Sequence, residues 1–72
     1  MPKLPVLSGA EVVRALERLG FEQIRQRGSH VVLQRGSAGC VVPLHKEVRK
    51  GTLATIIRQA GLSLDEFAGA LA

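Results

Sequence analysis

The spacing of apolar residues changes twice along the chain, and this change most constrains the fold. Over residues 8–20 apolar side chains recur every three or four positions, which is the spacing of one helix face. Over residues 21–44 apolar and polar residues tend to alternate, as in a half-buried strand, and from residue 51 the helical spacing returns. Strands joined by short turns pair antiparallel. We therefore expect an α+β fold: a three-stranded antiparallel sheet with helices packed on one face.

Capping residues mark where the helices begin and end. Two Ser-x-x-Glu segments, Ser8–Glu11 and Ser63–Glu66, have the spacing of a capping box. Gly20 and Gly61 are suited to end a helix. The sequence predicts a helix from Ser8 to Gly20, a second over residues 51–61 and a short third one after Ser63. The buried stripe expected for the second helix comprises Leu53, Ile56, Ile57 and Ala60.

Three strands are expected, over residues 21–27, 30–35 and 40–44. Gly28-Ser29 is a turn between the first two, and residues 36–39 form a short hairpin loop before the third. Phe21 and Ile24 cannot share a face of one regular strand, so either a bulge or a strand that starts after Phe21 is expected. Pro43 lacks a backbone N–H and fits an edge strand or a strand end.

Composition limits the class of protein. We expect residues 1–72 to form a single domain, near the size at which one hydrophobic core is only just sufficient. The chain has no Trp or Tyr, so the core must be largely aliphatic. No apolar run is long enough to span a bilayer, and the first residues lack the apolar stretch of a signal peptide. With Cys40 as the lone cysteine, a reducing cytoplasm is the simplest expectation.

Positive charge is concentrated in one part of the sequence. Residues 25–50 contain six basic residues and the single acidic residue Glu47, a net charge of +5, whereas the whole chain carries +4. A polyanion such as nucleic acid is the natural partner of such a block. The alternative is that the arginines only keep exposed strand faces soluble.

His30 is the candidate catalytic residue. If Val31 and Leu33 face the core, His30 points away from it, close in sequence to three arginines. An imidazole moves protons near neutral pH, and arginines hold phosphates. This combination suits metal-independent RNA cleavage, in which a base removes the 2′-hydroxyl proton and the oxygen attacks the adjacent phosphate. The alternative is a surface histidine without a function. The three arginines are Arg25, Arg27 and Arg35.

The segment before the second helix is a charged loop over residues 45–50 and a candidate anion site. Lys46, Arg49 and Lys50 precede a helix N-terminus, whose free N–H groups and dipole attract anions. Cations are unfavourable there for the helix itself, so their presence suggests an expected anion. A tight turn that happens to be charged is the alternative. His45 opens this segment and is either a second imidazole for RNA cleavage, a phosphate contact or a loop residue.

Other chemistries find little support in the sequence. The few carboxylates are dispersed, which argues against a metal-dependent nuclease site. Cys40 lies within a strand and is expected to pack as a small apolar residue. No glycine-rich nucleotide-binding loop is present. We therefore expect neither a metal nor a cofactor.

Three segments in order carry a family resemblance. They are "GF…RQRGSH" over residues 20–30, "VVPLH" over residues 41–45 and "GTLATIIRQAGLSLDEF" over residues 51–67. With these spacings, in a short basic chain, the sequence resembles the HicA family of bacterial toxins, also called YcfA-like proteins. The resemblance covers the chain from Ser8 onward.

The resemblance implies a fold, an activity and a partner. The family has a double-stranded-RNA-binding-domain-like fold, and its members are ribosome-independent mRNA interferases neutralised by a HicB antitoxin that covers the active face. Any operator DNA binding generally comes through the antitoxin. By position, His30 is the family's catalytic histidine, and Gly28 and Ser29 match its motif. The same resemblance assigns phosphate contacts to Lys46, Arg49 and Lys50, which lie before Gly-Thr-Leu. His45 corresponds to a histidine that recurs in many members, and Val31-Val32 replaces polar or histidine residues found in many others.

Two further functions stay open at this point. A non-catalytic RNA-binding module would use the same fold and basic face without needing His30. A purely structural partner subunit would bind protein but not RNA.

Overall fold

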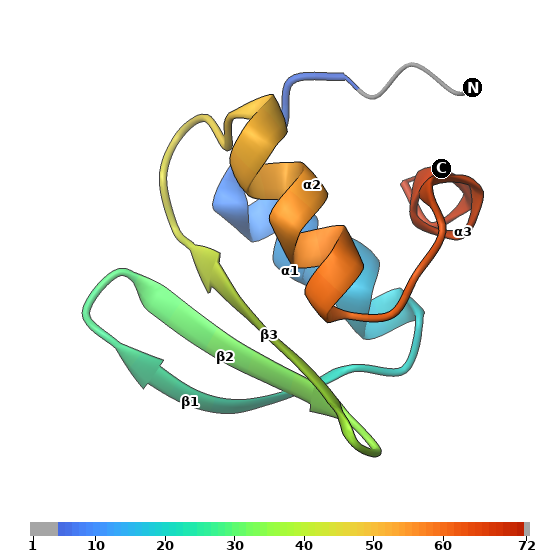
Figure 1. Ribbon diagram of the computed structural model, residues 1–72. Helices are drawn as coiled ribbons and strands as arrows, with labels where there is room; N and C mark the ends of the chain where they lie inside the picture. The colour runs from blue at the N-terminus through green and yellow to red at the C-terminus, as the bar shows by residue number, and fades with distance from the viewer. Residues whose placement is uncertain (1–4, 72) are drawn as a thin grey trace.

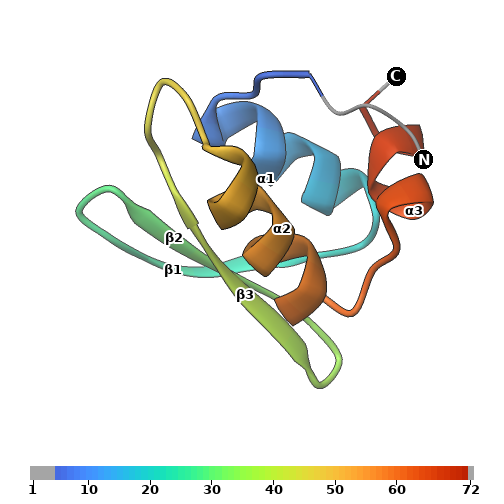
Figure 2. The same cartoon turned by 45° about the horizontal axis from the view of Figure 1, so that its top comes forward.

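The computed structural model describes residues 5–71 and has the predicted α+β architecture (Figure 1). The three strands form one antiparallel sheet in the order β1-β2-β3, so β2 is central. Helices α1 and α2 lie side by side on the same face of this sheet, and α3 packs next to the end of α1 (Figure 2). The elements are α1 (Gly9–Arg18), β1 (Glu22–Arg27), β2 (His30–Arg35), β3 (Ala38–Pro43), α2 (Lys50–Gln59) and α3 (Leu64–Gly69).

Both predicted capping boxes are present. The Ser8 backbone N–H donates to Glu11 Oε1 at 2.9 Å, and the Glu11 N–H donates to Ser8 Oγ at 3.2 Å. Ser63 and Glu66 make the same pair of bonds at 2.9 and 3.1 Å. The backbone hydrogen bond from each serine lowers the pKa of its glutamate, since the charged carboxylate is the better acceptor. These bonds satisfy N–H groups that the first turn would otherwise leave unpaired.

The ends of two strands differ from the prediction. β1 begins at Glu22 rather than Phe21. Its register with β2 also shifts between Gln23 and Arg25. The late strand start and the bulge, expected as alternatives, are therefore both present. β3 begins at Ala38 rather than residue 40 and ends at Pro43 rather than Leu44. The hairpin loop is therefore only Gly36-Ser37. A positive φ of 59° at Gly36 permits this two-residue turn, and pairing continues through Ala38.

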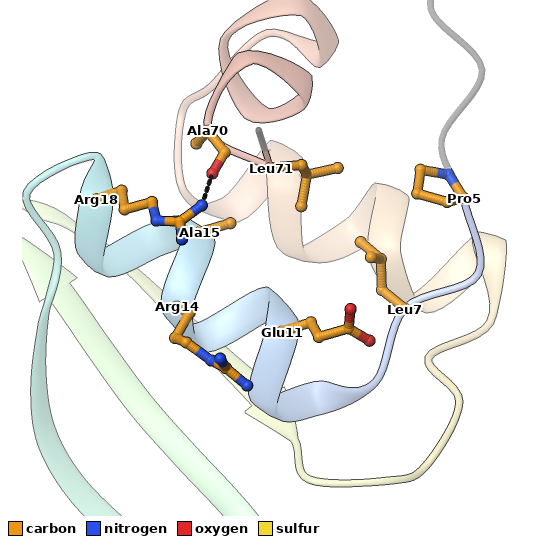
Figure 3. Close-up of a pocket in the computed structure, with 8 residues that line it drawn as sticks. All are labelled: Pro5, Leu7, Glu11, Arg14, Ala15, Arg18, Ala70 and Leu71. Carbon is orange, nitrogen blue, oxygen red and sulfur yellow. Dashed lines mark hydrogen bonds between the residues drawn. The ribbon is translucent and has the colours of Figure 1, made fainter.

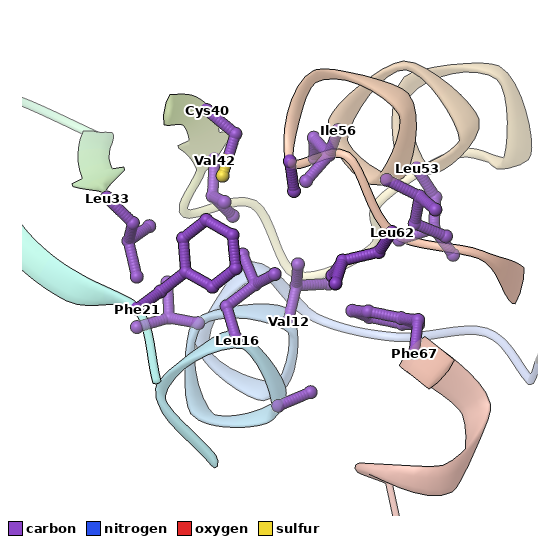
Figure 4. Packing of buried hydrophobic residues seen from close by; sticks show 14 of the residues in the cluster. Val12, Leu16, Phe21, Leu33, Cys40, Val42, Leu53, Ile56, Leu62 and Phe67 are labelled. Atoms are coloured by element: carbon purple, nitrogen blue, oxygen red, sulfur yellow. The ribbon is translucent and has the colours of Figure 1, made fainter. Parts of the chain in front are cut away.

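The core lies between the sheet and the helices (Figure 4). As predicted, Val31 and Leu33 of β2 face inward, and Cys40 packs beside them as an apolar residue. Burial raises the pKa of the Cys40 thiol to about 11. The expected stripe of α2 is buried, and Phe67 of α3 closes the far side of the core. None of the helices within residues 5–71 is long and apolar enough to cross a membrane.

The segment before α1 pairs with the segment before α2. Leu7 forms an isolated antiparallel bridge with Val48, and the Val48 N–H donates to the Leu7 carbonyl at 2.7 Å. Both side chains are buried. The sequence predicts only a charged loop over residues 45–50, without this anchor. Val48 has a charged residue on each side, and Leu7 lies in a short segment between Pro5 and Ser8, so no periodic signal marks either of them.

Candidate active site

His30 is the first residue of β2 and points away from the helices. Val31 and Leu33 fill the inner face of the strand, so the alternation of side chains sends His30 outward, where it is exposed. The preceding turn depends on Gly28, whose φ is +54°, although a Cβ at this position would meet no heavy atom within 4 Å. Gly28 is thus required for its backbone conformation rather than for space. We call the sheet surface opposite α1 and α2 the outer face; it carries Arg25, Arg27, His30, Val32 and Val41.

The structure brings His45 next to His30. Their ring centroids lie 6.4 Å apart, with the ring planes inclined at 71°. Pro43 pairs with His30 across the sheet, and the Leu44 N–H donates to the Ser29 carbonyl just beyond the end of β3. The short distance between the rings places His45 on the same side of the molecule as His30. The sequence does not show this convergence of the two histidines.

Gly9 holds the His45 backbone from the other side. The Gly9 N–H donates to the His45 carbonyl at 2.9 Å. A Cβ on Gly9 would lie 2.1 Å from the Pro43 carbonyl oxygen and 2.7 Å from Leu44 Cα, both of them backbone atoms. Only glycine therefore lets the start of α1 approach residues 43–45 so closely. In the sequence, Gly9 stands out only as a residue inside the capping box. A glycine at the first position of a helix is unusual for helix stability, and it could have indicated a close backbone contact.

Two arginines border His30 on the outer face. Arg27 is paired with His30 across β1 and β2, which puts their side chains next to each other. Arg25 is paired with Val32, and Val32 in turn with Val41. Both arginines are exposed. Within residues 5–71 no carboxylate forms an ion pair with either one. Both guanidinium groups are thus available to an anion that approaches the outer face.

Arg35 is at the opposite end of β2 and interacts with the fold. Its Nη1 donates to the Leu19 carbonyl at 2.7 Å, and its guanidinium carbon lies 4.9 Å from the Phe21 ring centroid. The length of the strand separates it from His30 by about 17 Å. The role in RNA binding expected from the sequence stays untested, and the position of Arg35 leads us to predict instead that it stabilises the fold.

The basic segment, Lys46 to Lys50, links His45 to α2. The side chains of Lys46, Arg49 and Lys50 are exposed. Arg49 occupies the N-cap of α2 without a side-chain hydrogen bond, and the first turn of α2 contains no acidic residue. Two adjacent basic surfaces, the outer face and this segment, therefore flank the two imidazoles.

Comparison with known families identifies the chain. Residues 9–62 match the family described as the HicA toxin of bacterial toxin-antitoxin systems, which covers more than half of the sequence. The chain belongs to the HicA toxin family. The matched region contains both histidines, Gly9 and the basic segment. A search of curated proteins found no match. Membership in the HicA family implies that the toxin is partnered with an antitoxin.

One pocket of this HicA toxin lies away from the histidines. It is formed by α1, residues 5–7 and the end of α3 (Figure 3). Arg18 Nη1 donates to the Ala70 carbonyl at 2.9 Å across it. Its volume of about 220 Å³ is below the usual size of a small-molecule site. The candidate active site is instead an open surface, which suits a polymeric substrate.

Proposed function

We propose that this HicA toxin is a ribosome-independent mRNA endoribonuclease that arrests translation, with His30 as its general base. The observation that carries this proposal is the position of His30, exposed on the outer face directly beside Arg27. A base and a phosphate-binding cation are thus present at one point of an open basic surface. With mRNA as the proposed substrate, we also propose that the toxin acts in the cytoplasm.

His30 would start the reaction by removing the proton of a ribose 2′-hydroxyl. The 2′-oxygen then attacks the adjacent phosphorus, and Arg27 and Arg25 stabilise the negative charge that develops on the phosphoryl oxygens. The backbone of Gly28 and Ser29 borders this position and contributes to RNA binding. Within residues 5–71 no three His, Cys, Asp or Glu side chains lie together in a way that could hold a metal ion. The mechanism proposed here uses the protein's own side chains.

The basic segment would hold the RNA strand beyond the cleavage point. Lys46, Arg49 and Lys50 are exposed next to the uncapped start of α2, where backbone N–H groups favour an anion. Phosphate contacts of this kind position a strand without reading its bases. They also make binding depend on salt, because each neutralised phosphate releases counterions.

A HicB-type antitoxin would neutralise the toxin by covering the outer face. No element within residues 5–71 covers this face, which presents Val32 and the 44% exposed Val41 beside Arg25. A partner with acidic groups around an apolar centre complements it. Arg27→Ala and Val32→Ser should each weaken antitoxin binding by about 1–2 kcal/mol. Unchanged affinity in both variants would contradict this interface. Any operator DNA would be reached through the antitoxin.

Growth after induced expression tests the nuclease directly. Wild type and His30→Ala are expressed without antitoxin, and the ends of cellular mRNA are mapped. Arrest and new RNA ends in the wild type alone support the proposal. Antitoxin binding by His30→Ala controls for folding. Equal arrest by both proteins would indicate the alternative, an RNA-binding module that blocks mRNA without cleaving it.

A further inference from the structure

We propose that His45 is the general acid of the reaction and protonates the leaving 5′-oxygen while His30 acts as the base. This inference rests on the proposed endoribonuclease function and adds a second catalytic residue to it. The observation behind it is the 6.4 Å separation of the two ring centroids, with both side chains exposed on the same side.

The two rings are close enough for one phosphodiester to lie across both of them. Proton transfer requires each imidazole nitrogen to come within about 2.6–3.2 Å of the oxygen it serves. At a centroid separation of 6.4 Å, with the planes inclined at 71°, the two rings are neighbours in an edge-to-face arrangement. A phosphodiester lying across the exposed edges of both rings can bring one oxygen to each imidazole, whereas rings much farther apart could not reach the same phosphate.

The backbone fixes this spacing. His45 lies two residues beyond the end of β3, and the Leu44 N–H donates to the Ser29 carbonyl in the turn that precedes β2. On the other side, the Gly9 N–H binds the His45 carbonyl at 2.9 Å. Val48 anchors the next residues through its bridge to Leu7. A surface loop without a function does not require these restraints, whereas two catalytic side chains must be held in a fixed position relative to each other.

The other polar groups of this region are poorer acids. Arg27 stays protonated in proteins and cannot supply a proton. The Glu11 carboxylate is held in the capping box of α1, and the hydrogen bonds from Ser8 lower its pKa. Lys46 is the neighbour of His45, but an ammonium gives up its proton less readily than an imidazolium at neutral pH. An imidazole is the side chain best matched to donating and accepting protons there.

Each proton and electron pair in the proposed step is accounted for. His30, neutral at the start, takes the 2′-hydroxyl proton, and the 2′-oxygen forms a bond to phosphorus. The bond between phosphorus and the 5′-oxygen breaks, and the 5′-oxygen takes its electron pair. His45, an imidazolium at the start, gives its proton to this oxygen. The products are one RNA ending in a 2′,3′-cyclic phosphate and one beginning with a 5′-hydroxyl; exchange with water restores both histidines.

A substrate with a better leaving group separates the two roles. A short RNA spanning a mapped cleavage site is made twice, once with natural chemistry and once with sulfur replacing the 5′-oxygen at that linkage. Sulfur leaves without needing a proton, so the modified RNA does not require a general acid. Wild type, His30→Ala, His45→Ala and His45→Gln are compared on both. Both histidines are exposed, and unfolding curves verify that each variant keeps the native stability.

On natural RNA we expect His45→Ala to lose about 10²- to 10⁴-fold in rate, the usual contribution of acid–base catalysis. On the sulfur substrate most of that loss should disappear for His45→Ala but not for His30→Ala. The matched control is Lys46→Ala, the exposed neighbour, which should lose activity equally on both substrates because it acts on binding.

The remaining outcomes overturn the inference in distinct ways. Normal cleavage of natural RNA by His45→Ala, with His30→Ala inactive, removes His45 from catalysis and leaves the proposed function intact. Equal loss by His45→Ala on both substrates makes it a binding residue. If the sulfur substrate restores the activity of His30→Ala but not that of His45→Ala, then His30 is the general acid and His45 the general base. If the wild type cleaves neither RNA, the proposed function itself fails.

Discussion

The two ends of β2 use basic side chains in opposite ways. At the C-terminal end, Arg35 binds the Leu19 carbonyl and covers the Phe21 ring. At the N-terminal end, His30 and Arg27 project from the outer face, and within residues 5–71 neither side chain has a hydrogen bond or ion pair with the protein. One end therefore stabilises the fold with its cation, and the other leaves its polar groups available to a ligand.

The helix starts show the same difference. α1 and α3 begin with complete capping boxes, whereas α2 begins with Arg49, which makes no capping hydrogen bond. A local departure from the rules of stability, in a protein that follows them elsewhere, is typical of functional positions. His45 shortly precedes the uncapped start of α2 in the chain, and its ring lies beside that of His30. This agreement supports a single functional surface at the N-terminal end of β2.

The largest effect is expected from filling the space at Gly9. In Gly9→Val the Cβ would overlap the Pro43 carbonyl, so residues 43–45 must move away from α1. We expect a stability loss of about 1–3 kcal/mol or more, the usual cost of overpacking, together with loss of RNA cleavage. Urea unfolding and cleavage of a mapped RNA measure the two effects. Gly51→Ala is the matched control, because nothing lies within 4 Å of its Cβ. A Gly9→Val protein with native stability and activity would disprove the close approach.

The two arginines should respond to substitution in opposite ways. Arg35→Met removes the bond to Leu19 and the cation over Phe21, and should lower the unfolding free energy by about 1–2 kcal/mol. RNA affinity should change little. Arg27→Met should leave stability nearly unchanged but weaken RNA binding and reduce its salt slope by about 0.7, the value for one phosphate contact on a single strand. Titrations at several salt concentrations test this. Similar RNA-binding losses in both variants would remove the distinction between the two ends.

The fold was predictable wherever a local pattern decides the structure. The alternation in β2 places Val31 and Leu33 inside and His30 outside, and the Ser-x-x-Glu spacing locates both caps. The start of β3 was missed because Ala38 and Gly39 have low strand propensity. Their pairing with β2 depends on the short turn at Gly36, not on their own side chains.

The site was predictable only in part, because its geometry depends on register. A four-residue loop over 36–39 would pair His30 with residue 45, whereas the observed two-residue turn pairs it with Pro43. The approach of His45 then depends on the backbone beyond β3 and on Gly9, which is distant in sequence. Alternation could identify His30 as exposed. It could not show which residue lies next to it.

One substitution at the N-cap of α1 and one at the N-cap of α2 test whether the start of α2 is less stable than it could be because it binds RNA. Arg49→Ser supplies a capping oxygen and removes a cation from the N-terminus, so it should stabilise the protein by up to about 1 kcal/mol and weaken RNA binding. Ser8→Ala should destabilise it by a similar amount without affecting RNA. Thermal unfolding measures the stability of both variants, and RNA titration measures their affinity for RNA. A more stable Arg49→Ser with unchanged RNA affinity would show that this helix start has no role in binding.

The smallest effect concerns the capped helix itself and depends on pH. The backbone hydrogen bond from Ser8 lowers the pKa of Glu11 in the folded protein. A carboxyl with a lowered pKa stabilises the fold fully above its unfolded-state pKa, and this contribution disappears as the pH falls through the folded value. Glu11→Gln should therefore be slightly less stable than the wild type at neutral pH, and the difference should vanish in acid. Unfolding curves between neutral and acidic pH measure this convergence. A difference that stays constant over that range would mean that the charge of Glu11 does not stabilise the start of α1.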